Sequence, residues 1–329
     1  MIKRVEYLDV AKGIGILLVV AGHIITRDNV LWNIIYAFHM PFFVFCSGIF
    51  YKQNRWKKRF FKNLLDYSLI GIIAIIIWYL IKEQGNIIYL KQSVFNIIIG
   101  GASPRNGIYP VEALWYLAAY GVILLIHNLV QKIYNKRTRF CIVVLIAIVG
   151  VVLGEVARPR FTMYYNLDVS MILYPFFYLG TKYNDVKETL KNKKQGKISV
   201  IVACALYLCL SLFNGYVNIY KAEYGKSVLI LYATSVIGIF LIVFLSKKVI
   251  CTVRSLCHLK LGLMKLGKHT LIIMGGHQLI IQYIKINCPN VASILTFSAA
   301  VLVTLFLSIA CDLILREGEK WFKNLSFKR

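Results

Sequence analysis

The sequence is short of charged residues, and of acidic residues in particular. Only 16% of its 329 residues are Asp, Glu, Lys or Arg, whereas about a quarter are charged in a typical soluble domain. Asp and Glu together number 14 and Lys and Arg number 39, so the formal net charge is +25. With 59% hydrophobic residues, this composition excludes both a soluble globular domain and an intrinsically disordered chain.

Patterns of metal ligands and of paired cysteines are also missing. The eight cysteines form no CxxC pair and no histidine-spaced ligand set, and most of them lie inside apolar runs. We therefore expect the cysteines to be small core residues, and we expect no metal site and no disulfide framework. The cysteines are Cys46, Cys141, Cys204, Cys209, Cys251, Cys257, Cys288 and Cys311.

What the sequence does contain is a series of long apolar runs. At about 20 residues per crossing, they predict a polytopic membrane protein with about ten transmembrane helices. We expect a single all-α transmembrane domain, one membrane bundle over residues 1–329, with no appended soluble domain. The runs cover residues 8–26, 34–50, 64–81, 112–130, 140–156, 167–181, 198–214, 227–246, 269–286 and 292–315.

The basic residues predict the orientation of the bundle. Most of the 39 Lys and Arg residues lie in alternate loops, and cytoplasmic loops are the ones enriched in cations, so both termini are expected in the cytoplasm. Basic clusters can also bind nucleic acid, but their position in short loops favours a topology signal, and no nucleic-acid partner is expected. Within the long outer segment 82–111, the apolar stretch 94–99 is too short to span and is expected to be an interfacial or re-entrant piece above a cavity.

Ionisable residues inside the first apolar run are candidate functional residues, because each costs roughly 2.5–3.5 kcal/mol in a bilayer. Asp9 and Lys12 are three residues apart and are placed to pair on one helix face. His23 lies about three turns and roughly 16 Å beyond Lys12, so both project from nearly the same face. One stripe thus carries a cation and, farther on, an imidazole. The structural alternatives are a snorkelling lysine and a hydrogen-bonded core histidine.

Three other runs carry polar candidates. His39, in the segment FHMPFFVFCSG, is expected at the same depth as His23. Glu112 and Trp115 begin the fourth run, where the carboxylate can orient an imidazole or a sugar hydroxyl and the indole also fits an interfacial aromatic belt. His277 lies in the middle of the ninth run, where a substrate contact and a core role are both open.

In this order, the segments resemble the acyltransferase-3 family of integral membrane O-acyltransferases, and the opening YLDVAKGIGILLVVAGH resembles its fucose 4-O-acetylase-like branch. Two positions depart from the family pattern: Lys12 stands where Arg is frequent, and Asp66 stands where Pro is usual at the start of the third helix. The matching features are Lys12 with His23 eleven residues later, FHMPFF…SG (38–48), the basic loop ending in Arg59, Leu114-Trp115, Pro175-Phe176 with Leu179-Gly180, and LGKHTLIIMGGH (266–277).

The resemblance implies transfer of an acyl group, usually acetyl, across the cytoplasmic membrane of a bacterium. The donor is acetyl-CoA, used as a substrate with no permanently bound cofactor, and the acceptor is a hydroxyl of a cell-envelope polysaccharide or lipid-linked glycan. His23 is the expected general base, and direct transfer and an acetyl-histidine intermediate are both open. The expected site residues are Asp9, Lys12 and Arg59 for the donor, His23, His39 and Glu112 for catalysis, and Trp115 and His277 for substrate.

Two other classes of function are compatible with ten helices and buried polar residues. A transporter or flippase for a glycolipid, a polysaccharide or a small polar solute would need a continuous water-accessible pathway, and the sequence shows no internal repeat of the kind common in transporters. A relative that binds or exports an amino acid, or serves as a membrane anchor, is the third class. The presence of both Lys12 and His23 argues against it.

Overall fold

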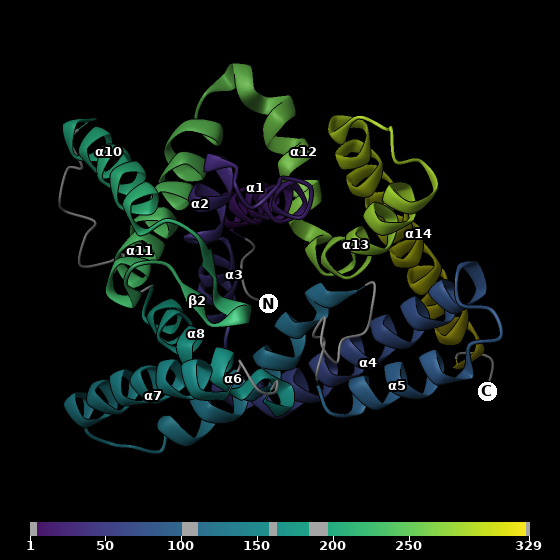
Figure 1. Cartoon of the computed structure of the whole chain (residues 1–329), viewed down its shortest axis with the longest axis horizontal. Helices are drawn as coiled ribbons and strands as arrows, with labels where there is room; N and C mark the ends of the chain where they lie inside the picture. The colour runs from purple at the N-terminus through teal and green to yellow at the C-terminus, as the bar shows by residue number, and fades with distance from the viewer. Residues whose placement is uncertain (1–4, 101–110, 158–162, 184–196, 327–329) are drawn as a thin grey trace.

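The computed structural model describes residues 5–100, 111–157, 163–183 and 197–326. In these ranges the structure is almost entirely helical, and the one short β-hairpin lies toward the middle of the bundle (Figure 1). The helices are α1 (Glu6–Gly22), α2 (Val30–Tyr36), α3 (His39–Ile49), α4 (Trp56–Ile81), α5 (Ile87–Ile98), α6 (Trp115–Val130), α7 (Lys136–Ala157), α8 (Leu167–Thr181), α10 (Lys197–Asn214), α11 (Val228–Phe244), α12 (Cys257–Lys268), α13 (Thr270–Asn287) and α14 (Ser293–Ser326).

Each of the ten expected ranges is occupied by helix, and an all-α membrane bundle fits the structure. Within the described ranges, six helical segments are long and apolar enough to cross a membrane. The number of ten crossings and the cytoplasmic position of both termini stay predictions. The six segments are Val30–Ile49, Gln53–Ile81, Glu112–Val130, Lys136–Ala157, Val228–Ile250 and Ser293–Leu313.

The helices α1 and α13 fall outside this group of six because they are short or polar. Helix α1 has 17 residues, and α13 carries His277, Gln278 and Lys285 in an otherwise apolar stretch. The two helices pack against each other, and α1 also packs against α3, α11 and α12, so that it lies inside the bundle (Figure 1). Their polar side chains can therefore face protein instead of lipid.

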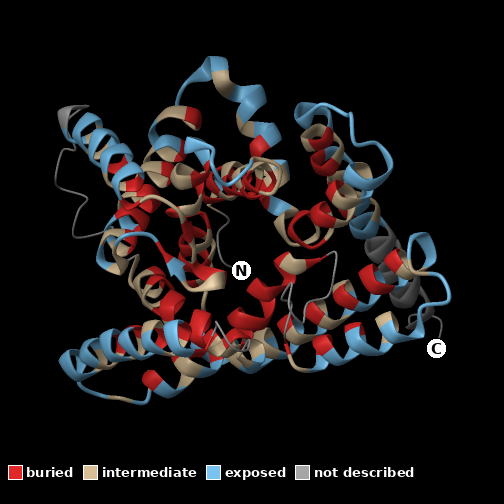
Figure 2. Cartoon of the chain, viewed as in Figure 1, coloured by how far each residue is buried: buried red, intermediate tan, exposed pale blue. Residues whose placement is uncertain are grey.

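Burial divides the bundle into an inner and an outer surface. Figure 2 shows buried residues gathered where the helices face the middle of the molecule, and exposed residues along the outward faces of α7 and α10. Large aliphatic and aromatic side chains are exposed on the outer helices, including Leu145 on α7, Ile201 on α10 and Phe306 on α14. Apolar exposure of this extent is what contact with lipid requires.

Two glycines fix the close packing of α1 against α12. A Cβ atom at Gly13 would collide with the carbonyl oxygen of Leu263, and a Cβ atom at Gly267 would collide with the carbonyl oxygen of Asp9. This packing places α12 directly beside the turn of α1 that carries Asp9 and Lys12.

The second expected span is broken into α2 and α3, and the break places His39 at the first position of α3. The side chain of Asn29 caps α2 by accepting a hydrogen bond from the backbone N–H of Leu31. Pro41 lies in the first turn of α3, where its missing N–H is not needed by the helix. The side chain of His39 is therefore presented from a helix start near the centre of the bundle.

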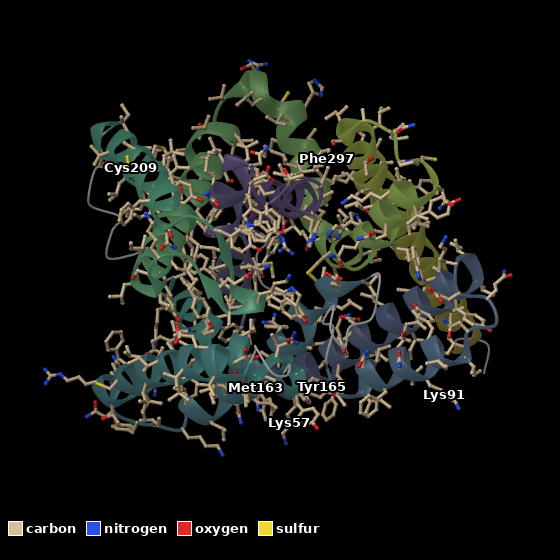
Figure 3. All side chains as sticks on the ribbon, in the orientation of Figure 1. Lys57, Lys91, Met163, Tyr165, Cys209 and Phe297 are labelled. Atoms are coloured by element: carbon tan, nitrogen blue, oxygen red, sulfur yellow. The ribbon has the colours of Figure 1, made fainter. Side chains whose placement is uncertain are left out.

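The cysteines and the outer segment 82–111 differ from what the sequence predicts. The cysteines are not core residues in general: Cys46 is buried and Cys251 half-buried, whereas the others are exposed, as Cys209 is on the outward face of α10 (Figure 3). The prediction of burial was wrong because hydropathy does not distinguish lipid-facing from core-facing positions, which are equally apolar. In the outer segment, the helix begins at Ile87, earlier than the apolar stretch 94–99, and residues 101–110 lie outside the described residues.

Candidate active site

The first helix presents a lysine–aspartate pair to the interior. The Lys12 Nζ atom lies 2.7 Å from the Asp9 Oδ1 atom, which confirms the pairing expected from their spacing. The Asp9 side chain is 6% exposed and the Lys12 side chain 21% exposed, so the cation is the more accessible partner. The Lys12 ammonium also lies 5.6 Å from the centre of the Phe50 ring.

A cavity of about 290 Å³, called here the lysine cavity, opens beside this pair. Lys62 in its wall pairs with Asp66 at 2.8 Å, so the aspartate that replaces the usual proline is held by its own helix, α4. Arg59 donates a hydrogen bond to the Ser47 carbonyl oxygen at 3.4 Å and forms no ion pair with a carboxylate in the described ranges. The charged and polar lining residues include Lys12, Ser47, Arg59, Lys62, Asn63 and Asp66.

A second cavity, of about 330 Å³, is lined by the candidate catalytic residues and is called here the histidine cavity. It brings together His23 from the end of α1, His39 from α3, and Glu112 and Trp115 from the start of α6. Arg27 and Lys221 line the same cavity, so its walls carry two cations and one carboxylate besides the histidines. Four of the predicted site residues, distant in sequence, thus share one cavity.

The side chain of Gln278 connects His23 to the start of α6. Its Oε1 atom accepts a hydrogen bond of 2.6 Å from the backbone N–H of Ala113, and its Nε2 atom lies 3.2 Å from the His23 Nδ1 atom. Sequence analysis missed Gln278. An amide in the apolar run of α13, next to His277, was the available signal, but its partners lie 165 and 255 positions away along the chain.

His39 has a different hydrogen-bonding arrangement. Its Nδ1 atom lies 2.9 Å from the carbonyl oxygen of Ile35, one turn earlier in the chain. The ring of Tyr36 meets the imidazole edge-on, with the ring centres 4.6 Å apart. Backbone and aromatic contacts therefore fix the orientation of an imidazole that is itself 5% exposed.

His277, in the ninth expected span, lies next to His23 and is not among the residues lining the two cavities. The centres of the two imidazole rings are 5.0 Å apart. The His277 Nδ1 atom lies 2.9 Å from the carbonyl oxygen of Ile273, and its Nε2 atom is buried without a hydrogen-bond partner in the described ranges. The predicted contact of His277 with substrate stays a prediction.

Stacked aromatic rings form much of the wall of the histidine cavity. Trp32 stacks on Tyr36 with ring centres 3.8 Å apart, and Trp115 stacks on Tyr220 at 5.4 Å. Tyr220 and Lys221 come from the hairpin of β1 (Val217–Asn218) and β2 (Glu223–Tyr224), which sequence analysis did not identify as part of the site. Beside it, Tyr216 stacks on Trp32, and burial raises the pKa of its phenol.

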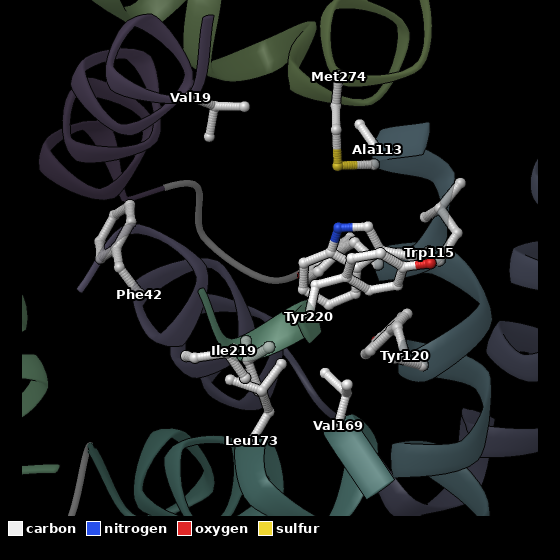
Figure 4. Close-up of a cluster of buried hydrophobic side chains, with 14 of the residues drawn as sticks. Val19, Phe42, Ala113, Trp115, Tyr120, Val169, Leu173, Ile219, Tyr220 and Met274 are labelled. Atoms are coloured by element: carbon white, nitrogen blue, oxygen red, sulfur yellow. The ribbon is translucent and has the colours of Figure 1, made fainter. Parts of the chain in front are cut away.

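Met274 separates the two cavities and lines both of them. Figure 4 shows its side chain reaching from α13 toward the indole of Trp115, with Ala113 beside its terminal methyl group. The adjacent residues Trp115 and Tyr116 on α6 line different cavities, the indole the histidine cavity and the phenol the lysine cavity. Met274, a flexible side chain, is therefore the lining residue that the cationic and histidine-bearing cavities share.

Comparisons with known proteins identify the family of the chain. Residues 5–313 match the acyltransferase-3 family model, described as an acyltransferase domain. Nodulation protein NolL of Sinorhizobium fredii is 24% identical over 294 residues, which cover 80% of this chain and 75% of that protein. No solved structure matches significantly. The family match extends over nearly the whole chain and includes every residue of both cavities. This chain therefore belongs to the acyltransferase-3 family of acyltransferases.

Proposed function

We propose that the chain is a membrane O-acyltransferase that moves an acyl group, in the simplest case acetyl, from acyl-CoA to a sugar hydroxyl. The acceptor is a cell-envelope polysaccharide or a lipid-linked sugar, and the protein acts in the cytoplasmic membrane of a bacterium. Family membership supplies the reaction class. The observation that carries the proposal is the meeting of the lysine cavity and the histidine cavity at Met274.

The lysine cavity is the proposed entrance for the donor. Coenzyme A carries several phosphate charges, and Lys12 and Arg59 supply cations within one cavity. Arg59 supports this role most directly, because its guanidinium has no carboxylate partner in the described part of the chain and can bind a phosphate with two parallel hydrogen bonds. Asp9 would hold the Lys12 side chain in place.

The histidine cavity is the proposed site of the acceptor. Stacked indole and phenol rings, Trp32 with Tyr36 and Trp115 with Tyr220, offer apolar faces framed by polar groups, a combination suited to a sugar ring. Glu112 would accept hydrogen bonds from hydroxyl groups of the acceptor. The pantetheine arm of the donor, which is uncharged, would carry the thioester past Met274 into this cavity.

The chemistry is nucleophilic attack on the thioester carbon. A histidine of the cavity takes the proton of the sugar hydroxyl as the oxygen–carbon bond forms. The carbon–sulfur bond then breaks, its electron pair goes to sulfur, and the coenzyme A thiolate leaves. Hydrogen-bond donors in the cavity would stabilise the negative charge on the carbonyl oxygen of the tetrahedral intermediate. Either His23 or His39 can provide the base in this general scheme.

The orientation proposed from the basic loops places the lysine cavity toward the cytoplasm. Arg59 lies in the first turn of α4, within the basic segment 51–63, one of the segments enriched in Lys and Arg. This orientation gives the donor cavity access to cytoplasmic acyl-CoA and gives the histidine cavity access to acceptors on the far side.

The test uses inside-out membrane vesicles from cells that produce the full chain. Acetyl-CoA with a radiolabelled acetyl group is added outside the vesicles, and the glycan fraction is recovered and analysed by NMR for O-acetyl groups. We expect label in carbohydrate with the wild-type chain and none with a His23→Ala, His39→Ala double variant. His258→Ala is the matched control, because His258 is exposed on α12 and lines neither cavity.

The same vesicles separate the proposal from a transport function. Solute uptake without any label in carbohydrate would overturn the acyltransferase proposal and favour a transporter. Equal labelling by wild-type and double-variant chains of normal abundance would show that the histidine cavity is not the site of transfer.

A further inference from the structure

The side chain amide of Gln278 has one orientation that satisfies both of its neighbours. The backbone N–H of Ala113 is a donor, so the atom that faces it at 2.6 Å must be the carbonyl oxygen. The NH₂ group is consequently the atom 3.2 Å from the His23 Nδ1 atom. An amide NH₂ group can only donate, and the hydrogen-bond network thereby settles which way the amide points.

This orientation determines the tautomer of His23. Because Nδ1 accepts the hydrogen bond from Gln278, it carries no proton, and the proton of the neutral ring is on Nε2. A proton added to Nδ1 would face the NH₂ group of Gln278, donor against donor. While Gln278 holds this position, neither nitrogen of His23 is available to take a proton from a substrate.

His39 has the opposite tautomer. The carbonyl oxygen of Ile35 can only accept, so the Nδ1 atom of His39, 2.9 Å away, carries the proton and donates it. The Nε2 atom of the neutral ring therefore has a free electron pair. No hydrogen bond occupies this atom in the described ranges, and His39 lines the histidine cavity.

His277 provides an internal comparison. It has the same arrangement as His39, with Nδ1 donating to a carbonyl oxygen one turn earlier, that of Ile273. However, its Nε2 atom is fully buried, and the residue is not among those lining the cavity. Of the three histidines in this region, His39 is the one that combines a free electron pair with a position in the cavity wall.

We infer that His39 is the general base of the transfer reaction and that Gln278 is a positioning residue that holds His23 as an Nε2–H donor. The inference rests on the proposed function and assigns different roles to His39 and His23 in the reaction. His39 Nε2 takes the proton of the acceptor hydroxyl while the oxygen bonds to the thioester carbon. His23 Nε2–H donates a hydrogen bond to the carbonyl oxygen, which becomes negatively charged. When the carbon–sulfur bond breaks, the proton on His39 passes to the leaving thiolate.

Glutamine substitutions distinguish the two roles, because a glutamine retains an N–H donor but has no basic nitrogen. In the vesicle assay, His39→Gln is expected to lose acyl transfer by about 100- to 10,000-fold, as a missing general base does. His23→Ala is expected to lose about 100- to 1,000-fold, whereas His23→Gln retains a donor and is expected to be at least tenfold more active than His23→Ala. Activity that survives His39→Gln but not His23→Gln would overturn the assignment.

A spectroscopic measurement tests the positioning role of Gln278 without relying on activity. Nitrogen-15 NMR of histidine-labelled protein in lipid nanodiscs distinguishes protonated from unprotonated ring nitrogens, and single His→Gln variants assign the signals. We expect His23 to be protonated at Nε2 in the wild-type chain, and Gln278→Met to shift His23 toward a mixture of both tautomers. A His23 ring protonated at Nδ1 in the wild-type chain would overturn the inference.

The two failures are distinguishable. A wild-type chain that transfers no acyl group would overturn the proposed function, and the base assignment with it, whatever the tautomers are. An active wild-type chain with a fully active His39→Gln variant would overturn the base assignment alone. Gel-filtration profiles and thermal unfolding of each variant confirm that lost activity does not reflect lost folding.

Discussion

Asp9 and Lys12 form a 2.7 Å ion pair one turn apart on α1, and the lysine of this pair lines the cationic cavity. Removing one partner leaves the other charge inside the bundle without the bond it makes here. The Asp9 carboxylate holds the Lys12 ammonium that is proposed to bind a donor phosphate. The stability of the bundle and the binding of the donor therefore depend on the same ion pair.

The first prediction concerns that coupling. Asp9→Asn and Lys12→Met are each expected to lower the stability of the bundle by about 3 kcal/mol, because each breaks a largely buried ion pair. The double variant is expected to recover most of this loss but to bind coenzyme A as poorly as Lys12→Met alone. Thermal unfolding in nanodiscs and calorimetric titration with coenzyme A measure the two effects. Additive stability losses would contradict the pairing.

Arg59 carries the second prediction. Replacing it by Ala removes a charged hydrogen-bond donor from the lysine cavity, and we expect the Kd for coenzyme A to rise by about 10- to 100-fold. Arg59→Lys is expected to recover part of the affinity, since Lys retains the charge but not the planar pair of donors. Lys58→Ala is the control, because this neighbouring cation is exposed on α4. An equal loss from both positions would indicate a general effect of surface charge.

The third prediction concerns Met274, which lies between the cavities. A tryptophan there adds a large rigid ring at the boundary, so Met274→Trp is expected to abolish acyl transfer while coenzyme A still binds. Met274→Leu has a similar volume and is expected to retain most of the activity. Transfer rates and coenzyme A binding are measured on the same preparations. Undiminished transfer by Met274→Trp would show that the donor takes another route.

Two glycines on α12 form a matched pair for the fourth prediction. At Gly267 an added Cβ atom meets the carbonyl oxygen of Asp9, whereas at Gly262 nothing lies within 4 Å. We expect Gly267→Ala to lower the stability by about 1–3 kcal/mol through overpacking. Gly262→Ala is expected to raise it by about 0.5–1 kcal/mol, because alanine favours the helix. Thermal unfolding of both variants checks the opposite signs.

The apolar runs predicted where the helices lie, because burial in lipid or protein imposes one requirement on every helix of the bundle. The shared face of Lys12 and His23 stays a prediction from helix geometry, and the two residues line different cavities. The pairing of Asp9 with Lys12 followed from the same rule. In such local patterns the interacting residues lie a few positions apart in the same helix, so the sequence itself identifies both partners.

Features that depend on distant partners were not visible in the sequence. Gln278 bonds to Ala113 and His23, and no local pattern indicates either contact. The hairpin that supplies Tyr220 consists of two strands of two residues each, too short to give an alternating pattern. The exposure of Cys209 was hidden because a lipid-facing residue and a core residue have the same hydropathy. In each case the missing information was which surface the residue faces.

The boundary formed by Met274 also has a consequence for the membrane itself. An enzyme that serves substrates on both sides of a bilayer must join two aqueous compartments chemically without joining them electrically. On the proposed function, the Met274 side chain that both cavities share would exclude water and ions between them, so that the reactants could meet without dissipating the proton gradient of the cell.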